Sequence, residues 1–236
     1  MLLRRVRVAA LCFVGMIVSA EADVIGAATS AKNAVSGSLG SVIQTLVVGS
    51  QVSGSEVVTT GTDSATLLRF LDDTNLNIGA SSTVVLDRFV YNPDGSAANA
   101  VINISRGAMR FVTGKSNPNN FAIHTDVATI GIRGTDFVVF CNGHATCIVA
   151  IKKGVVKICP HPDTLVDGCR DAYEIDPVNN YTFIGPGGKT KGAQQIAGDI
   201  MLRLYGIIAD GGKFDVATFA PRYQGPPPPP PSSVSP

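Results

Sequence analysis

Residues that could ligate a metal ion are grouped in the middle of the chain. Cysteine and histidine side chains are ligands that zinc prefers, and four of them are enough to surround a tetrahedral ion. The group consists of Cys141, His144, Cys147, Cys159 and His161. In an oxidising compartment, however, the same cysteines would form disulfides before they met a metal ion. The choice between a zinc site and disulfides therefore depends on the compartment.

The start of the chain indicates which compartment this is. Three arginines within the first seven residues precede an apolar run from Val8 to Val18, and Ala20-Glu21-Ala22 follows. A positive segment, a short apolar run and an A-x-A pattern predict a secretory signal peptide at residues 1–22. The alternative is an uncleaved membrane anchor, but the apolar run is much shorter than the roughly 20 residues that span a bilayer. We expect a periplasmic or secreted protein with no integral membrane segment after signal cleavage.

Removal of this segment, which contains Cys12, leaves an even number of cysteines in an oxidising compartment. Three pairings of these four residues are possible. Pairing Cys141 with Cys147 and Cys159 with Cys169 closes two short loops that contain turn residues. We therefore favour these two disulfides over a metal site, and we expect His144 and His161 to be solvated loop residues.

A histidine and a carboxylate offer a second candidate chemistry. His124 and Asp126 are two positions apart, and on a strand this spacing places a base and an orienting carboxylate on one face. No nucleophile with a local signature, such as G-x-S-x-G or S-x-x-K, accompanies them. The ordinary explanation, a surface histidine at the end of a strand, is favoured, and we expect no catalytic residues.

Two loops resemble ion or phosphate sites without matching either motif. The stretch "LDDTNLN" at 71–77 has the carboxylates of a calcium loop but lacks its glycine and terminal glutamate, so a hairpin turn explains it as well. The stretch "GPGGKT" at 185–190 resembles a phosphate loop, but Phe183 occupies the place of the first required glycine. We interpret the second stretch as a flexible glycine hinge.

The charge of the chain excludes one class of partner. Cleavage of the signal would remove three arginines and one glutamate, and would change the formal net charge from +1 to −1. A near-neutral protein lacks the basic surface that nucleic acid binding requires. We therefore predict a non-enzymatic protein that needs no cofactor and does not bind nucleic acid.

Short apolar runs predict an all-β domain at about residues 45–185. Runs rich in valine, isoleucine, threonine and phenylalanine alternate there with glycine and turn residues. A sandwich or a short β-solenoid would bury their apolar faces, and both alternatives stay open. Residues 23–44 are small and polar, and we expect a flexible leader.

The period changes near the C-terminus. Within a helical segment at 190–212, apolar residues recur at spacings of three and four, which predicts an amphipathic helix at about residues 192–209. The stripe consists of Ile196, Ile200, Leu204, Ile207 and Ile208. We expect it to dock on the β-domain, although a partner helix is the alternative. The proline-rich tail at 213–236 is expected to be an extended, disordered arm, a spacer rather than a recognition motif.

The stretch "IHTDVATIGIRGTDFVVF" resembles the most recognisable part of the FecR-domain family. The family pattern is a strand, a corner rich in glycine around an arginine, and another strand. The matching residues here are Thr125, Ala128, Gly131, Ile132, Arg133, Gly134, Thr135, Asp136 and Phe137. Upstream and downstream strands also follow the order of the family, so the resemblance covers about residues 45–160. It implies a β-rich, solenoid-like fold.

Physical chemistry suggests an architectural role for this motif. Gly131 and Gly134 permit backbone angles or close approaches that a side chain would forbid. Arg133 carries five donors and could bind strand-end carbonyl groups or pair with Asp136. We interpret the motif as a structural latch, with a ligand site as the alternative, and we expect substitution of Arg133 to lower thermal stability.

Two functions follow from these observations. The first is an exported, stand-alone FecR-like module that binds a protein or a cell-envelope polymer. The second is a periplasmic component of transmembrane signalling of the iron-uptake type, which regulates a sigma factor. The resemblance implies that signalling members also carry a cytoplasmic anti-sigma segment and a membrane helix, whose place a predicted signal peptide takes here.

Overall fold

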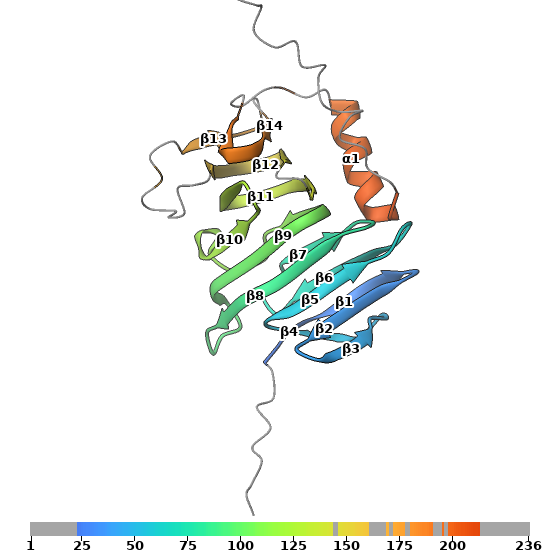
Figure 1. The fold of residues 1–236 in the computed structure, drawn as a ribbon. Helices are drawn as coiled ribbons and strands as arrows, with labels where there is room; N and C mark the ends of the chain where they lie inside the picture. The colour runs from blue at the N-terminus through green and yellow to red at the C-terminus, as the bar shows by residue number, and fades with distance from the viewer. Residues whose placement is uncertain are drawn as a thin grey trace, which may run out of the picture.

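The computed structural model is mainly β with one α-helix near the C-terminus, as the sequence predicts (Figure 1). It describes residues 23–143, 146–160, 169, 172–177, 180–190, 195 and 198–212. The predicted signal peptide at 1–22, the tail at 213–236, His144 and His161 lie outside the described residues. One 14-stranded sheet contains the described strands, and the pairing is antiparallel except between β9 and β10.

The strands differ widely in length, and the three longest connect the two halves of the sheet. The bounds are β1 Val24–Lys32, β2 Val35–Leu39, β3 Val42–Thr45, β4 Gln51–Ser53, β5 Glu56–Thr60, β6 Ala65–Phe70, β7 Asn75–Ile78, β8 Thr83–Tyr91, β9 Ala97–Val112, β10 Phe121–His124, β11 Ala128–Asn142, β12 Cys147–Pro160, β13 Tyr173–Ile175 and β14 Tyr181–Ile184. Two short 3₁₀ turns, Pro118–Asn120 and Pro186–Gly188, and the helix α1, Gly198–Asp210, complete the fold.

The sheet divides into two layers at β9. The first part of β9 pairs with β8 and β10, whereas its last part pairs with β7 and β11. Layer A therefore contains β3, β2, β5, β8, the first part of β9 and β10, and layer B contains β4, β1, β6, β7 and the last part of β9. The strands β11 and β12 also run through both layers, and β13 and β14 pair with opposite ends of β12.

A single core lies between the two layers. Apolar residues alternate with polar ones along most strands, so each layer buries one of its faces against the other layer. Layer A contributes Val58, Val84 and Leu86, and layer B contributes Leu68 and Leu76, to the same cluster of fully buried side chains. The sequence is compatible with a sandwich and with a solenoid. Burial between two layers is common to both, so the solenoid description stays a prediction.

The helix α1 packs on the outer face of layer B. Met201, Leu204, Tyr205 and Ile208 join a second buried cluster with outward residues of β9, β11, β12 and β14. This arrangement confirms the predicted docking of the helix, which the structure describes over Gly198–Asp210. Within the described residues, no helix is long and apolar enough to cross a membrane.

The leader that the sequence predicts at 23–44 is instead part of the sheet. Residues 24–45 form β1, β2 and β3, and Ile25 and Ala28 are buried in the core. The sheet therefore begins at Val24 and not near Thr45. Small residues concealed these strands because their packing depends on neighbours that are distant in sequence, and β1 pairs with β6 about 40 residues later.

Both predicted disulfides are present. Cys141 is bonded to Cys147 and Cys159 to Cys169. The first disulfide closes the hairpin between β11 and β12, where the two cysteines are paired in register. All three cysteines of the alternative zinc site are therefore in disulfides.

Candidate functional site

The first residues of the FecR-like motif close a tight turn between β10 and β11. The side-chain oxygen of Thr125 accepts hydrogen bonds from the backbone N–H groups of Val127 and Ala128, at 3.2 and 2.9 Å. Ala128 begins β11 and is completely buried. Thr125 and Ala128 therefore define the angle at which β11 enters layer A.

The centre of the motif is the bend by which β11 passes from layer A to layer B. Register with β12 shifts between Arg133 and Asp136, and Gly134 has a φ of 66°. Opposite it, Gly154 has a φ of 84°, and a Cβ atom there would overlap the carbonyl oxygen of Gly134. Both strands thus bend at the same level, and only glycine at position 154 allows their backbones to approach this closely.

Asp136 pairs with Arg110 and not with Arg133, which corrects one sequence expectation. The two oxygens of its carboxylate accept from Nε and Nη2 of Arg110, both at 2.8 Å, and the carboxylate is only 13% exposed. The hydrogen bond raises the pKa of Arg110 further above its ordinary value. Arg110 lies on β9, next to β11, so the pair joins two strands of layer B.

The helix α1 completes this cluster through Tyr205. Its hydroxyl donates to the carbonyl oxygen of Asp136 at 3.1 Å, and its ring lies 4.6 Å from the Arg110 guanidinium. Burial, together with the Asp136 carboxylate, raises the pKa of the Tyr205 hydroxyl. Two further motif residues are buried: Thr135 lies beside Thr113, and Phe137 packs in the core against Phe111.

Arg133 is the exception within the motif because its side chain faces solvent. It is 58% exposed and pairs with Glu174 of β13 at 3.1 Å. A pair this exposed contributes little to stability, so the predicted role of Arg133 as a structural latch is not supported by its contacts. Its position on the outer face of layer A leaves it available to a ligand.

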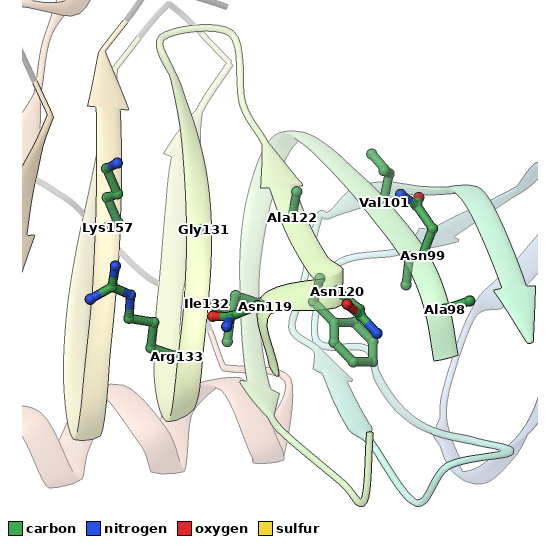
Figure 2. A pocket seen from close by; sticks show the side chains of 12 residues that line it. Ala98, Asn99, Val101, Asn119, Asn120, Ala122, Gly131, Ile132, Arg133 and Lys157 are labelled. Carbon is green, nitrogen blue, oxygen red and sulfur yellow. The ribbon is translucent and has the colours of Figure 1, made fainter. Parts of the chain in front are cut away.

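Arg133 borders a groove that crosses the outer face of layer A (Figure 2). The groove has a volume of about 500 Å³. Cross-strand register places Val101, Ala122, Gly131 and Lys157 in one row over β9, β10, β11 and β12. Because the central members are small, the row forms a floor, and longer polar side chains stand at its sides: Asn99, Asn119, Asn120, Arg133 and Lys157.

The other candidate sites of the sequence do not form a reactive cluster. His124 ends β10, and Asp126 follows in the exposed turn rather than on the same strand. In "LDDTNLN", Asp72 accepts from the backbone and hydroxyl of Thr74, and Asp73 pairs with Arg69 and Lys115, as in a hairpin turn. Among the residues that the structure describes, no group of histidine, cysteine and acidic side chains could hold a metal ion.

The stretch "GPGGKT" forms a 3₁₀ turn at Pro186–Gly188, after which Thr190 bridges back to Ile184. This geometry matches a turn at the end of β14. The groove could not be predicted from the sequence, because its side chains come from four strands and a 3₁₀ turn that are separated along the chain. The only sequence signal was the small, polar character of Asn99 and "SNPNN" at 116–120.

Residues 56–157 match the family model described as FecR protein. This part of the chain is a FecR domain. It extends from β5 to β12 and contains the motif bend, the Arg110–Asp136 pair and most of the groove. The resemblance found in the sequence is therefore confirmed, and together the FecR domain and the two disulfides are consistent with a location outside the cytoplasm.

Two solved structures align with part of this chain at low identity. Two crystal structures of a protein from Parabacteroides distasonis ATCC 8503, described as a candidate anti-sigma factor, align with 14% identity and a TM-score of 0.47. Each alignment covers 64% of this chain, and 64% or 65% of the other. The chain thus spans less than two thirds of those structures. No curated protein is similar enough to match this chain.

Proposed function

We propose that this protein is a non-enzymatic, extracytoplasmic FecR-type module that binds a partner protein in the groove of layer A. The single observation that carries the proposal is the position of the groove, since the FecR motif residue Gly131 lies in its floor and Arg133 stands at one side. The motif thereby combines two roles: its buried residues make the bend, and its outward residues border the groove.

The chemistry of the lining supports binding rather than catalysis. Among the described residues, the lining of the groove includes no serine, cysteine, histidine, aspartate or glutamate, so it offers no nucleophile or general base of these types. It offers amide groups on one side and the cations Arg133 and Lys157 on the other. These groups donate to carbonyl and carboxylate oxygens.

The same lining favours a polypeptide over a sugar polymer. Phe121 is the single aromatic residue that the structure describes in the lining, and it is only 2% exposed, so it presents no ring face for a sugar to stack on. A floor of alanine, valine and glycine admits an extended backbone, and asparagine side chains can bond to its amide groups. An acidic, extended segment of a partner protein fits these features best.

A second candidate function places this binding event in transmembrane signalling that regulates a sigma factor. The FecR domain favours it, because the family resemblance implies signalling across the envelope of the iron-uptake type. The partner would then be an outer-membrane receptor or a separate membrane regulator. Both candidates use the same groove and differ only in the identity of the partner.

Capture from an envelope extract tests the proposal. Immobilised wild-type protein is compared with the double variant Arg133→Ala/Lys157→Ala, and with the control Arg69→Ala/Lys115→Ala, which removes two cations near the β6–β7 turn. We expect one protein, identified by mass spectrometry, to bind wild type and control but not the groove variant. A receptor or a sigma regulator would support the signalling candidate. Equal capture by all three proteins, or capture of glycan alone, would refute the proposed use of the groove.

A further inference from the structure

The N-terminal end of the sheet finishes in an apolar strand with an open edge. Within the described part of the chain, β3 pairs with β2 alone, and it is the outermost strand of layer A (Figure 1). All four residues of β3 are exposed, and Ile43 is 75% exposed. Its second edge therefore presents a row of backbone N–H and C=O groups, which is a template for another strand.

The turn that follows β3 enlarges this apolar surface. Val47 and Val48 are both more than half exposed, directly after the buried Leu46. Together with Val42 and Ile43 they form what we call the β3 edge. The described structure has eight exposed large apolar side chains, and these four are all within seven consecutive residues. Such clustering marks an interaction surface, because singly scattered apolar residues are normal and clustered ones are not.

The β3 edge also lacks the devices that usually protect an edge strand. Residues 33–55 include no aspartate, glutamate, lysine, arginine, histidine or proline. Natural edges are normally protected by charges, prolines or bulges that prevent pairing with another chain. At the opposite end of layer A, β13 carries Glu174, which forms an ion pair with Arg133. The two ends of the layer thus differ in the charged residues that oppose association of edges.

We propose that the β3 edge pairs with the β3 edge of a second copy of this chain. An edge without charge cannot select a foreign partner electrostatically, but it matches its own copy in length, neutrality and apolar surface. Antiparallel pairing of two identical strands about a two-fold axis satisfies both edges at once. The pairing would join two layers A into one continuous sheet and bury Val42, Ile43, Val47 and Val48 of both copies.

Dimerisation through β3 leaves both grooves open. The groove lies on β9 to β12, and three strands, β2, β5 and β8, separate β9 from β3 in layer A. Two grooves on one particle would bind a partner that presents two copies of its segment more tightly than one groove could. This consequence is independent of whether the groove binds a protein or a polymer.

The oligomeric state of the protein purified after export tests the proposal. Light scattering coupled to size exclusion should show a dimer for wild type and for the control Leu202→Lys, which adds a charge at a residue of α1 that is 67% exposed. The variant Ile43→Lys should be a folded monomer with an unchanged circular dichroism spectrum, because Ile43 is 75% exposed within one copy and its side chain does not support the fold of that copy. A monomeric wild type, or an Ile43→Lys dimer, would overturn the proposal.

Cysteine crosslinking identifies which strand mediates the dimer. Cys141, Cys147, Cys159 and Cys169 are all in disulfides, so a new cysteine supplies the reactive thiol. Single cysteines at Val42, Ile43, Gln44 and Thr45 should give a covalent dimer on mild oxidation, strongest at the position nearest the two-fold axis. The control Leu202→Cys should remain uncrosslinked. A dimer linked at position 202 but at none of the β3 positions would refute pairing through β3.

Discussion

The outer faces of the two layers have opposite characters although the same strands build both. On layer B, the outward residues Ala108, Val138, Ile148 and Ala150 are apolar, and α1 covers them. On layer A, the outward residues are small or polar, no described helix covers them, and a groove results. The strands β9, β11 and β12 contribute to both faces, one on each side of the bend.

The difference shows how one strand can serve two purposes. An apolar outward face must be buried, and the helix supplies that cover from the end of the chain. Exposing a face of alanine, glycine, asparagine and two cations to water costs little free energy, so this face can stay open for a ligand. The bend at Gly134 and Gly154 separates these two functions, and the following substitutions test that separation.

The largest effect is expected from Gly154→Ala, which acts on the bend itself. The new Cβ would overlap the carbonyl of Gly134, and the residue would keep a φ of 84° that disfavours alanine. Backbone strain and the clash together should lower the free energy of unfolding by more than about 4 kcal/mol. The control Gly95→Ala has a similar positive φ but open space around it, and should cost about 1 kcal/mol. Similar urea denaturation midpoints for the two variants would contradict the close approach of the β11 and β12 backbones at Gly134 and Gly154.

The next largest effect is expected on the outer face of layer B, which α1 covers. Leu204→Ala removes a side chain that is almost fully buried between α1 and layer B, and should cost about 3 kcal/mol. Leu202→Ala, on the exposed side of the same helix, should change stability by less than about 0.5 kcal/mol. Chemical denaturation of both variants measures the difference. If they are equally stable, α1 does not form a permanent cover.

A smaller effect is expected where the motif meets the helix. Asp136→Asn removes the charge that pairs with Arg110 and should destabilise the protein by about 2 kcal/mol, since the carboxylate is mostly buried. Asp73→Asn, in a more exposed pair with Arg69, should cost less than Asp136→Asn. Thermal unfolding at pH 7 compares the two. A larger loss for Asp73→Asn would show that the cluster around Asp136 is not the stronger interaction.

Alkaline pH tests the same cluster through the Tyr205 hydroxyl. The pKa of Tyr205 is raised above its unfolded value, because burial disfavours the phenolate. Its contribution to stability is therefore complete below pH about 10 and is lost as the pH rises above that value. Unfolding followed between pH 8 and 11 should show a smaller alkaline loss in Tyr205→Phe than in wild type. Identical pH profiles for the two proteins would show that ionisation of Tyr205 does not cause the alkaline loss of stability.

The smallest effect on stability is expected on the open face. Arg133→Ala breaks one exposed ion pair and should change the free energy of unfolding by less than about 0.5 kcal/mol, contrary to the expectation from sequence. Its effect should instead appear as weaker capture of the partner. A marked drop in melting temperature would instead support the structural role that the sequence predicts for Arg133. The residue would then contribute to stability, as residues of the covered face do.

Much of the fold was accessible from local patterns. Alternating apolar residues predicted strands, a spacing of three and four predicted α1, and loop length predicted both disulfides. The strands at residues 24–45 escaped notice because small residues carry a weak pattern. Their place in the sheet depends on β6, which pairs with β1 in three dimensions.

The sequence by itself determined the β class, the FecR motif and the cysteine pairing, since each depends on residues close together along the chain. Only the tertiary structure decided that Asp136 binds Arg110, 26 positions away, rather than Arg133 three positions away. It likewise decided that Val101, Ala122, Gly131 and Lys157 share one floor. The physical reason is the register of the strands. Hydrogen bonding between strands selects which distant side chains become neighbours, and a bend in one strand moves its later residues from one layer to the other.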